Sequence, residues 1–105
     1  MALLEEIRAK VLRRQCEFSK HAVDQIIIRD ITVAEVEEAI ANQSEVIEND
    51  PEDKYGPSCL IFGFTYSGRP LHVQCSYANR PLVKVITLYE PDPNLWVDLR
   101  VRRIG

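Results

Sequence analysis

The stretch Leu71–Tyr77, which reads LHVQCSY, decides the fold that we expect for this chain. Apolar and polar side chains alternate along it, which is typical of a β-strand with one buried face. Turn sequences bound it on both sides, SGRP at 67–70 and ANRP at 78–81, and each leads to another strand-like run. The stretch is therefore predicted to be the middle strand of an antiparallel meander, between residues 58–66 and 82–89.

Pairing the apolar side chains across the two hairpins predicts their registers. With a tight turn in each, Phe62 falls opposite Cys75 in the first hairpin, and Val73 falls opposite Ile86 in the second. One face of the sheet is then apolar on all three strands, apart from Lys84. We expect this face to carry the helices and the other face to remain open.

His72 lies at the centre of the open face in these registers. Thr65 and Thr87 flank it, one on each neighbouring strand, and Tyr89 lies diagonally beside it. A histidine in mid-sheet beside two hydroxyl groups is a candidate functional residue. The simpler interpretation is a half-exposed strand histidine that forms hydrogen bonds with threonine.

Three segments before the sheet have helical patterns. Residues 2–15 carry an apolar stripe among charged residues. Ser19 is a good N-cap for a helix over residues 20–29, and the capping-box spacing of Thr32 and Glu35 marks the start of a third helix. The second helix is expected to bury one apolar stripe, formed by Ala22, Val23, Ile26 and Ile27.

The opposite stripe of the second helix is polar. His21, Gln25 and Arg29 recur at intervals of four residues and stack above one another on a helix. His21 lies in the first turn, where the helix dipole lowers the pKa of an imidazole. A neutral histidine there can act as a base or as a hydrogen-bond donor, and a solvated polar face is the simpler interpretation.

The remaining segments complete the predicted architecture. Residues 44–49 can add an edge strand to the meander. The fold class is then α+β, with two or three N-terminal helices packed on a four-stranded antiparallel meander sheet, in a single domain of residues 1–105. Residues 1–17 hold the N-terminal helix. Residues 97–105 form a basic tail, either a last strand or a disordered end, and Trp96 is expected to anchor it on the sheet or a helix.

Composition indicates an ordinary soluble protein of 105 residues, with 46% hydrophobic and 28% charged residues. No apolar run approaches the roughly 20 residues that cross a bilayer, and the charged N-terminus lacks a signal-peptide core, so we expect no membrane association. Three scattered cysteines and two histidines make a zinc site improbable and fit a cytoplasmic protein with reduced thiols and no cofactor. The net charge of −3 argues against indiscriminate nucleic-acid binding.

Several short motifs occur at fixed spacing along the chain. They are SKHA at 19–22, RDIT at 29–32, EVIE at 45–48, GRPLHV at 68–73, VITLY at 85–89 and PD at 91–92, with Trp96. In this order they resemble a small bacterial family, the one catalogued as domain of unknown function 4258. The resemblance covers residues 18–96.

The resemblance implies a fold related to the RelE-like ribonuclease toxins and a toxin–antitoxin system. The partner it implies is an antitoxin, often a small zinc-finger or helix-turn-helix protein. By this likeness His21, Arg29 and His72 match the polar signature positions of the family, and Tyr89 is a further match. The chain departs from the family at Gln25, where an arginine is common.

Metal-independent RNA cleavage needs a base, an acid and a cation or several hydrogen-bond donors. His72 and His21 are the candidate acid and base, Arg29 the candidate phosphate ligand and Tyr89 a group that orients the substrate or stacks on a base. This chemistry requires His21 and His72 to converge in one cleft. The further candidates for substrate binding are Arg69, Lys84, Thr87, Thr65 and Gln25.

Three functions remain open from the sequence. The first is a RelE-like endoribonuclease that acts on RNA or on the ribosome. The second is a non-catalytic interaction module of the same fold that binds a protein partner through a sheet face or edge. The third is a small-ligand-binding protein, with Gly63 opposite Gln74 leaving part of the sheet surface uncovered.

Overall fold

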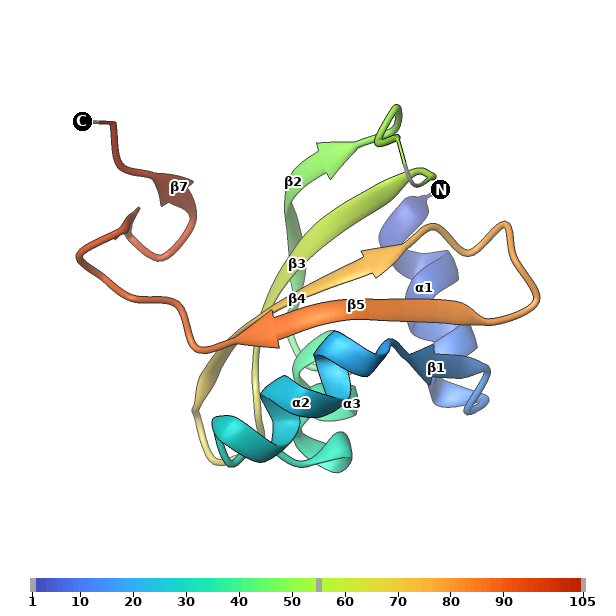
Figure 1. The fold of residues 1–105 in the computed structure, drawn as a ribbon, viewed down its shortest axis with the longest axis horizontal. Helices are drawn as coiled ribbons and strands as arrows, with labels where there is room; N and C mark the ends of the chain where they lie inside the picture. Colours follow the sequence, from blue (N-terminus) through green and yellow to red (C-terminus); the bar gives the residue numbers. More distant parts are fainter. Residues whose placement is uncertain (1, 55, 105) are drawn as a thin grey trace.

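The computed structural model describes residues 2–54 and 56–104, and over these residues the protein is α+β, with three helices and a mainly antiparallel sheet (Figure 1). The predicted α+β class is therefore confirmed. In chain order the elements are α1 (Leu3–Leu12), β1 (Cys16–Phe18), α2 (Lys20–Ile28), α3 (Val33–Ala41), β2 (Glu45–Asp50), β3 (Ser58–Phe64), β4 (Pro70–Ser76), β5 (Val83–Tyr89), β6 (Trp96–Val97) and β7 (Val101–Arg102).

The main sheet of the described chain has five strands, in the order β1-β5-β4-β3-β2. Neighbouring strands are antiparallel except β1 and β5, which run parallel. The prediction of a four-stranded antiparallel sheet is therefore wrong, because it missed β1. This strand has only three residues, Cys16–Phe18, too few to show an alternating pattern.

The hairpin of β3 and β4 has a different register from the predicted one. Phe62 lies opposite His72 rather than opposite Cys75. The difference arises in the turn, where the hydroxyl of Thr65 accepts a hydrogen bond from the backbone N–H of Arg69 at 3.0 Å. A shift by an odd number of residues exchanges the two faces of a strand, so Phe62 shares the face of His72.

The hairpin of β4 and β5 is displaced as well. Val73 lies opposite Leu88 rather than opposite Ile86, and the register shifts between Gln74 and Cys75. The shift leaves Ile86 without a directly opposite residue on β4, as in a β-bulge. The tight second turn that we predicted is therefore wrong.

These registers give His72 other neighbours than those predicted. Tyr89 lies directly opposite His72, and Thr87 lies opposite Gln74. Thr65 is buried in the turn that joins β3 to β4, where its hydroxyl lies 2.9 Å from that of Ser67. The prediction that two threonines flank His72 is therefore wrong.

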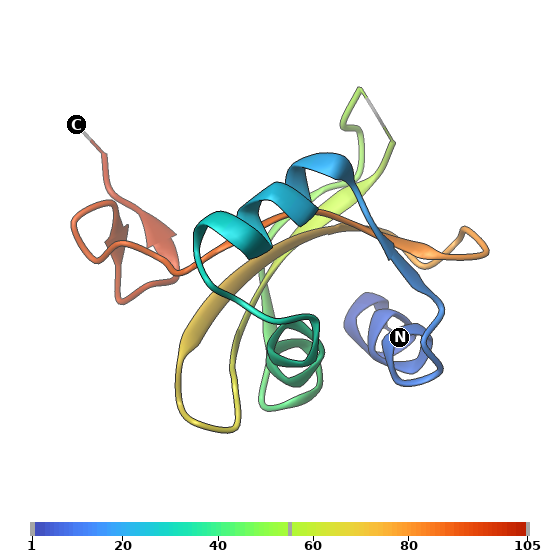
Figure 2. The ribbon, with the colours of Figure 1, turned by 60° about the horizontal axis from the view of Figure 1, so that its bottom comes forward.

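The hydrophobic core lies between one face of the sheet and helices α1 and α3. Figure 2 shows these two helices together on the lower side of the sheet. Leu71 and Val73 of β4 point into this core, so His72 between them points to the opposite face. The buried residues of the core are Ile7, Val11, Ala22, Ile31, Val36, Ala39, Ile40, Cys59, Ile61, Leu71, Val73, Cys75, Val83, Val85 and Leu88.

Gly63 lets α3 approach β3 closely. A Cβ atom at this position would lie 1.8 Å from the carbonyl oxygen of Ala39, well inside van der Waals contact. Gly63 lies opposite Leu71 rather than opposite Gln74. The prediction that it uncovers part of the open face is wrong, because the missing side chain makes room for a helix instead.

The predicted starts of α2 and α3 are confirmed. The Ser19 hydroxyl accepts a hydrogen bond from the backbone N–H of Ala22 at 3.0 Å, and it donates one to the carbonyl of Ile86 at 2.7 Å. Thr32 and Glu35 form the capping box that opens α3. These caps are local, so three or four residues of sequence are enough to predict them.

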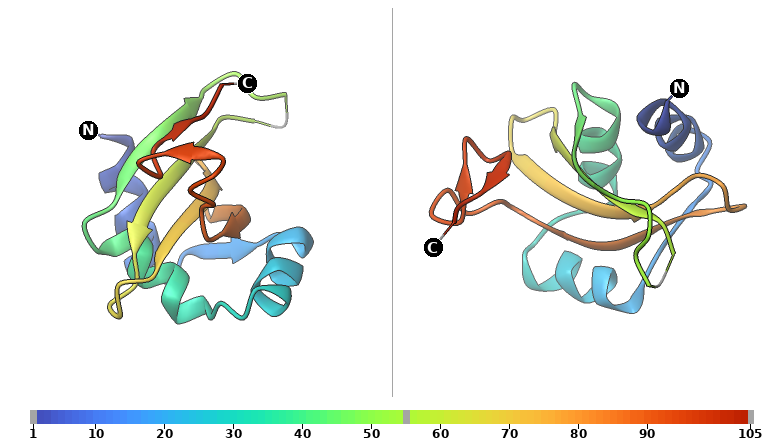
Figure 3. Two further views of the ribbon diagram at one scale, coloured as in Figure 1. Left: turned by 90° about the vertical axis from the view of Figure 1, so that its left-hand side faces the viewer. Right: turned by 90° about the horizontal axis from the view of Figure 1, so that it is seen from above.

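Helix α2 runs beside β5 at the edge of the sheet, on the opposite side of β5 from α1 and α3 (Figures 2 and 3). Because an edge helix has one narrow contact face, only Ala22 is fully buried and Ile26 packs on the core. Val23 and Ile27 are exposed. The predicted four-residue buried stripe is therefore half wrong.

The tail folds back over the other face of the sheet. Strands β6 and β7 form a two-stranded sheet of their own, which we call the C-terminal hairpin (residues 96–102). The left view of Figure 3 shows it in front of β2 and β3. Trp96 anchors it in a buried position, as predicted. No helix of the described residues is long and apolar enough to cross a membrane.

Candidate functional site

His72 lies fully buried beneath the C-terminal hairpin. Aromatic side chains surround its ring. The rings of Phe62 and Tyr89, on the neighbouring strands, have centroids 5.4 Å and 5.3 Å from that of His72. The indole of Trp96 meets the imidazole edge to face, with centroids 4.5 Å apart. His72, the functional candidate on the sheet, therefore has no direct access to solvent.

Hydrogen bonds fix the tautomer of His72. Its Nε2 lies 2.7 Å from the backbone carbonyl of Leu99, which can only accept, so Nε2 carries the proton and donates. Nδ1 then accepts from the hydroxyl of Tyr89, at 3.3 Å. Burial lowers the pKa of His72 below 6.5, partly opposed by the hydrogen bond to Leu99. The ring is thus a neutral acceptor at physiological pH.

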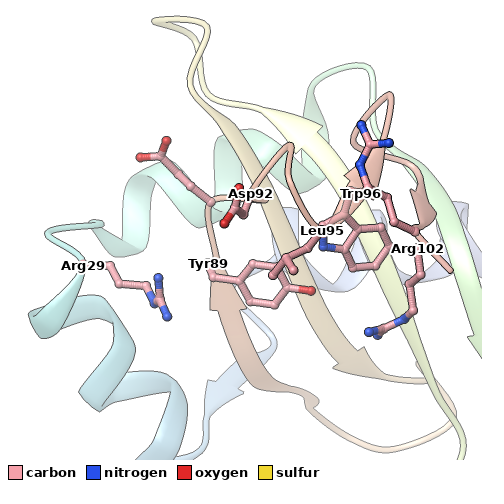
Figure 4. A pocket seen from close by; sticks show the side chains of 8 residues that line it. Arg29, Tyr89, Asp92, Leu95, Trp96 and Arg102 are labelled. Atoms are coloured by element: carbon pink, nitrogen blue, oxygen red, sulfur yellow. The ribbon is translucent and has the colours of Figure 1, made fainter. Parts of the chain in front are cut away.

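A cleft of about 540 Å³ opens between the end of α2, the end of β5 and the C-terminal hairpin. Figure 4 shows Arg29 extending from one wall toward Tyr89, with Trp96 and Arg102 on the other side. Neither histidine lines this cleft, although the Tyr89 hydroxyl joins it to the buried His72. The lining residues are Arg29, Tyr89, Glu90, Asp92, Leu95, Trp96, Arg102 and Arg103.

The charges in the cleft are unequally neutralised. Arg102 forms a two-pronged ion pair with Glu48, at 2.7 and 3.0 Å. Arg29 donates to the amide of Gln25, and Arg103 donates to a backbone carbonyl. Among the described residues no carboxylate pairs with Arg29 or Arg103, so these two guanidinium groups remain available to an anion.

Tyr89 is the one phenol among the described residues that line the cleft. Burial raises the pKa of its hydroxyl, an effect that the nearby Arg102 opposes. Because the hydroxyl donates its proton to His72, its oxygen lone pairs remain free to accept a hydrogen bond from a ligand. Tyr89 therefore links a ligand in the cleft to the buried imidazole.

The structure separates the two predicted histidines. His21 is exposed in the first turn of α2, whereas Arg29 is the C-cap of the same helix. Eight residues of helix place them about 12 Å apart along the axis. The requirement that His21 and His72 share one cleft is not met in this conformation.

Arg69 has a positioning role. Its guanidinium donates to the backbone carbonyls of Arg29 and Asp30, at 3.0 and 2.9 Å, and it pairs with Glu35 and Glu90. These contacts tie the connection between α2 and α3 to the sheet. Arg69 therefore fixes the position of Arg29 and does not line the cleft.

The other predicted substrate-binding residues lie elsewhere, apart from Gln25. Lys84 lines a second hollow of about 550 Å³, next to Arg80 and near the start of α2. Thr65 and Thr87 take the places given above, away from the cleft. Gln25 lies beside the cleft because it contacts Arg29. No group of described residues has the composition of a metal site.

Sequence reasoning missed the contribution of the tail to this cleft. Leu95, Arg102 and Arg103 line it, and the Leu99 carbonyl binds His72. A signal was present in the single tryptophan of the chain, which is followed closely by three arginines. The partners of Arg100 and Arg102 on β2 are more than 50 residues away in sequence, so the spacing alone could not reveal the pairing.

A family model matches residues 18–90, and the chain therefore belongs to the family described as Domain of unknown function (DUF4258). The match includes α2, α3 and β2–β5, with His21, Arg29, His72 and Tyr89. It ends one residue after Tyr89, so the C-terminal hairpin lies outside it. No curated protein and no solved structure matches the chain significantly.

Proposed function

We propose that this protein is a RelE-like endoribonuclease of the toxin type, which binds single-stranded RNA in the cleft between Arg29 and the C-terminal hairpin. The observation that carries the proposal is the meeting of unpaired guanidinium groups with Tyr89 and Trp96 in one cleft. Guanidinium groups bind phosphate, and aromatic rings stack on unpaired bases. The volume of about 540 Å³ suits one nucleotide and its phosphate.

The cleavage step would use Tyr89 and His72 together. Arg29 and Arg103 hold the phosphate while the ribose 2′-hydroxyl gives its proton to the Tyr89 oxygen, and Tyr89 passes its own proton to Nδ1 of His72. The 2′-oxygen attacks phosphorus, the bond to the 5′-oxygen breaks, and this oxygen takes a proton from water. His72 then returns its proton through Tyr89 to the hydroxide. No step needs a metal ion or His21.

The test is RNA cleavage by the purified protein, with total RNA and with translating ribosomes as substrates. Tyr89→Phe keeps the ring but removes the proton path, and we expect it to lower the cleavage rate on the order of 100-fold. His21→Ala is the matched histidine control and should leave the rate unchanged. Equal cleavage by wild type and Tyr89→Phe would refute the step.

RNA affinity is measured separately from cleavage. Arg29→Ala should weaken RNA binding on the order of tenfold and reduce its salt dependence, because one phosphate contact is lost. Arg13→Ala removes another exposed arginine, at the end of α1, and serves as the charge control. If both substitutions weaken binding equally, the affinity reflects overall charge and the cleft is not the RNA site.

A non-catalytic module that binds a protein partner is the second candidate. The observation that favours it is the complete burial of His72, which prevents direct contact between the imidazole and a ligand in the cleft. An antitoxin is the partner that the toxin-type proposal implies. Growth arrest on expression that Tyr89→Phe abolishes would favour the enzyme. Unchanged growth with a stable complex of the protein and a neighbouring gene product would favour the module.

A further inference from the structure

The C-terminal hairpin is held to the main sheet by side-chain contacts and by one hydrogen bond from the His72 side chain to the Leu99 carbonyl. In the described chain no backbone-to-backbone hydrogen bond joins it to the five-stranded sheet. Its turn places Leu99 at φ 58°, a left-handed conformation that costs a non-glycine residue about 1 kcal/mol. The segment 91–94, which contains two prolines, connects it to β5. The hairpin is therefore attached in a way that allows it to detach as a unit.

The sheet surface beneath the C-terminal hairpin presents two glutamates to two arginines of the hairpin. A bulge in β2 shifts the register between Val46 and Glu48. In a regular strand residues 45 and 48 would point to opposite faces, whereas the bulge brings both glutamates to the side of the hairpin. Arg100 pairs with Glu45 at 3.1 Å and Arg102 pairs with Glu48 at 2.7 Å.

Between these glutamates and β5, two aromatic side chains of the sheet, Phe62 and His72, contact the hairpin. Trp96 packs against His72, and the guanidinium of Arg100 lies 4.8 Å from the ring centroid of Phe62. We call the surface of Phe62, His72, Glu45 and Glu48 the hairpin groove. Its chemistry matches one aromatic side chain and two arginines.

The groove and its occupant are separate segments of the chain. All four groove residues lie on β2, β3 and β4, within residues 45–72, and the hairpin that covers them comes from residues 96–102. Because the hairpin is joined to β5 only through residues 91–94, a segment of another chain that presents the same side chains can take its place.

We propose that the hairpin groove is a protein-docking site for a partner segment that presents one aromatic and two arginine side chains, and that the C-terminal hairpin occupies it in the free protein. The docking site does not depend on the RNA proposal. It has a consequence for it, however, because Trp96, Arg102 and Arg103 line the RNA cleft. A partner that displaces the hairpin takes these three residues out of the cleft.

The test uses the hairpin sequence itself as the probe. Trp96→Ala removes the only tryptophan of the 105-residue chain and weakens its own hairpin. A synthetic peptide of residues 91–104, PDPNLWVDLRVRRI, is then the only tryptophan fluorophore in the mixture. We expect a saturable blue shift of its emission as the indole enters the groove, in the absence of RNA.

Two comparisons make the result specific. A peptide with both Arg100→Ala and Arg102→Ala should bind roughly tenfold more weakly, because it loses the ring contacts of the arginines as well as the ion pairs. Protein with Glu45→Gln and Glu48→Gln, which loses only the ion pairs, should bind the unaltered peptide roughly fivefold more weakly. Protein with Trp96→Phe, which keeps a competing hairpin, should also bind it more weakly than Trp96→Ala, because a tethered segment acts at an effective concentration on the order of millimolar.

The proposal is overturned if Trp96→Ala is folded by circular dichroism and the peptide shows no shift. It is also overturned if the arginine-free peptide binds equally well, since the contact would then be non-specific. If Trp96→Ala does not fold, Trp96→Phe with excess peptide decides in the same way. Failure of peptide binding leaves RNA binding by Arg29 untouched, so the two proposals fail separately.

Discussion

The two faces of the sheet are both covered, but they are held in different ways. On one face α1 and α3 cover a continuous apolar core, and the backbone of α3 meets Gly63 directly. On the other face a short hairpin covers one buried histidine through a tryptophan, two arginines and a single hydrogen bond to His72. The first face therefore carries the stability of the domain, whereas the second has a cover that can open.

The largest expected effect is that of Gly63→Ala on the helix face. The new Cβ would lie 1.8 Å from the carbonyl oxygen of Ala39, and both atoms belong to rigid backbone elements. The helix or the strand must move, which we expect to lower the free energy of unfolding by about 3 kcal/mol or more. Chemical denaturation measures this difference.

Gly68→Ala is the matched control for this substitution. Gly68 has open space around its Cβ position but a φ of +91°, so the substitution strains only the turn. Its cost should be about 1 kcal/mol. Equal costs at the two glycines would mean that α3 does not press on β3 as the structure shows.

The next effect compares one buried side chain from each face. Ile61→Ala opens a cavity in the helix-covered core and should cost about 2–4 kcal/mol of global stability. Trp96→Ala removes a larger side chain, but the hairpin can detach locally, so the global cost should be about 1 kcal/mol or less. Hydrogen exchange distinguishes the two, since only residues 96–102 should lose protection in Trp96→Ala.

Global loss of protection in Trp96→Ala would contradict the distinction between the faces. The hairpin would then be part of the same cooperative unit as the core. Denaturation of the two variants side by side gives the same answer from the unfolding free energies, because a locally attached segment contributes little to the global transition.

The same distinction explains which features the sequence could predict. The caps at Ser19 and at Thr32 with Glu35 were predictable, because each depends on residues within one helical turn. The strand positions were predictable from alternation, but the registers were not. Residues 59–64 are apolar on both faces of β3, since one face meets the helices and the other lies under the tail, so the pattern could not show which residues face which side.

The cleft was predictable in part. Arg29 and Tyr89 were candidates from the motifs, and the structure brings them to one cleft. His72 was a candidate as well, but its burial depends on Trp96 and on the Leu99 carbonyl, which reach it from the end of the chain. Contacts of this kind depend on the path of the whole tail, and no local pattern encodes them.

A smaller expected effect is a loss of stability at low pH on the face that the hairpin covers, and it depends on His72. The pKa of His72 is lowered in the folded protein, so the folded state binds fewer protons than the unfolded state as pH falls below 6.5. The stability from the neutral ring is present above pH 6.5 and is lost as pH falls from there toward the folded-state pKa. Among the charged groups around the ring, Glu48 opposes the shift and Arg102 supports it.

The expected observation is a red shift of Trp96 emission on acidification below pH 6.5, before global unfolding, because the charged ring is expelled from its buried place and the hairpin opens. His72→Gln removes the titrating group and should abolish this step. His21→Gln, at the exposed histidine, should retain it. If the red shift of Trp96 emission persisted in His72→Gln, protonation of carboxylates rather than of His72 would cause it.

The smallest effect concerns the ion pairs of the hairpin, and it decides what holds the hairpin in place. Glu48 and Arg102 are 36% and 66% exposed, so water screens their attraction even though the pair is two-pronged. Glu48→Gln should therefore cost only about 0.5 kcal/mol, and less at high salt. Arg102→Ala should cost more, since it also removes the guanidinium that lies 4.7 Å from the Trp96 ring centroid.

A double-mutant cycle of Glu48→Gln and Arg102→Ala on thermal unfolding, followed by Trp96 emission, isolates the energy of this ion pair. A coupling energy above about 2 kcal/mol would mean that the charges fasten the hairpin, whereas the small value that we expect leaves the glutamates to select the partner and Trp96 to provide the affinity.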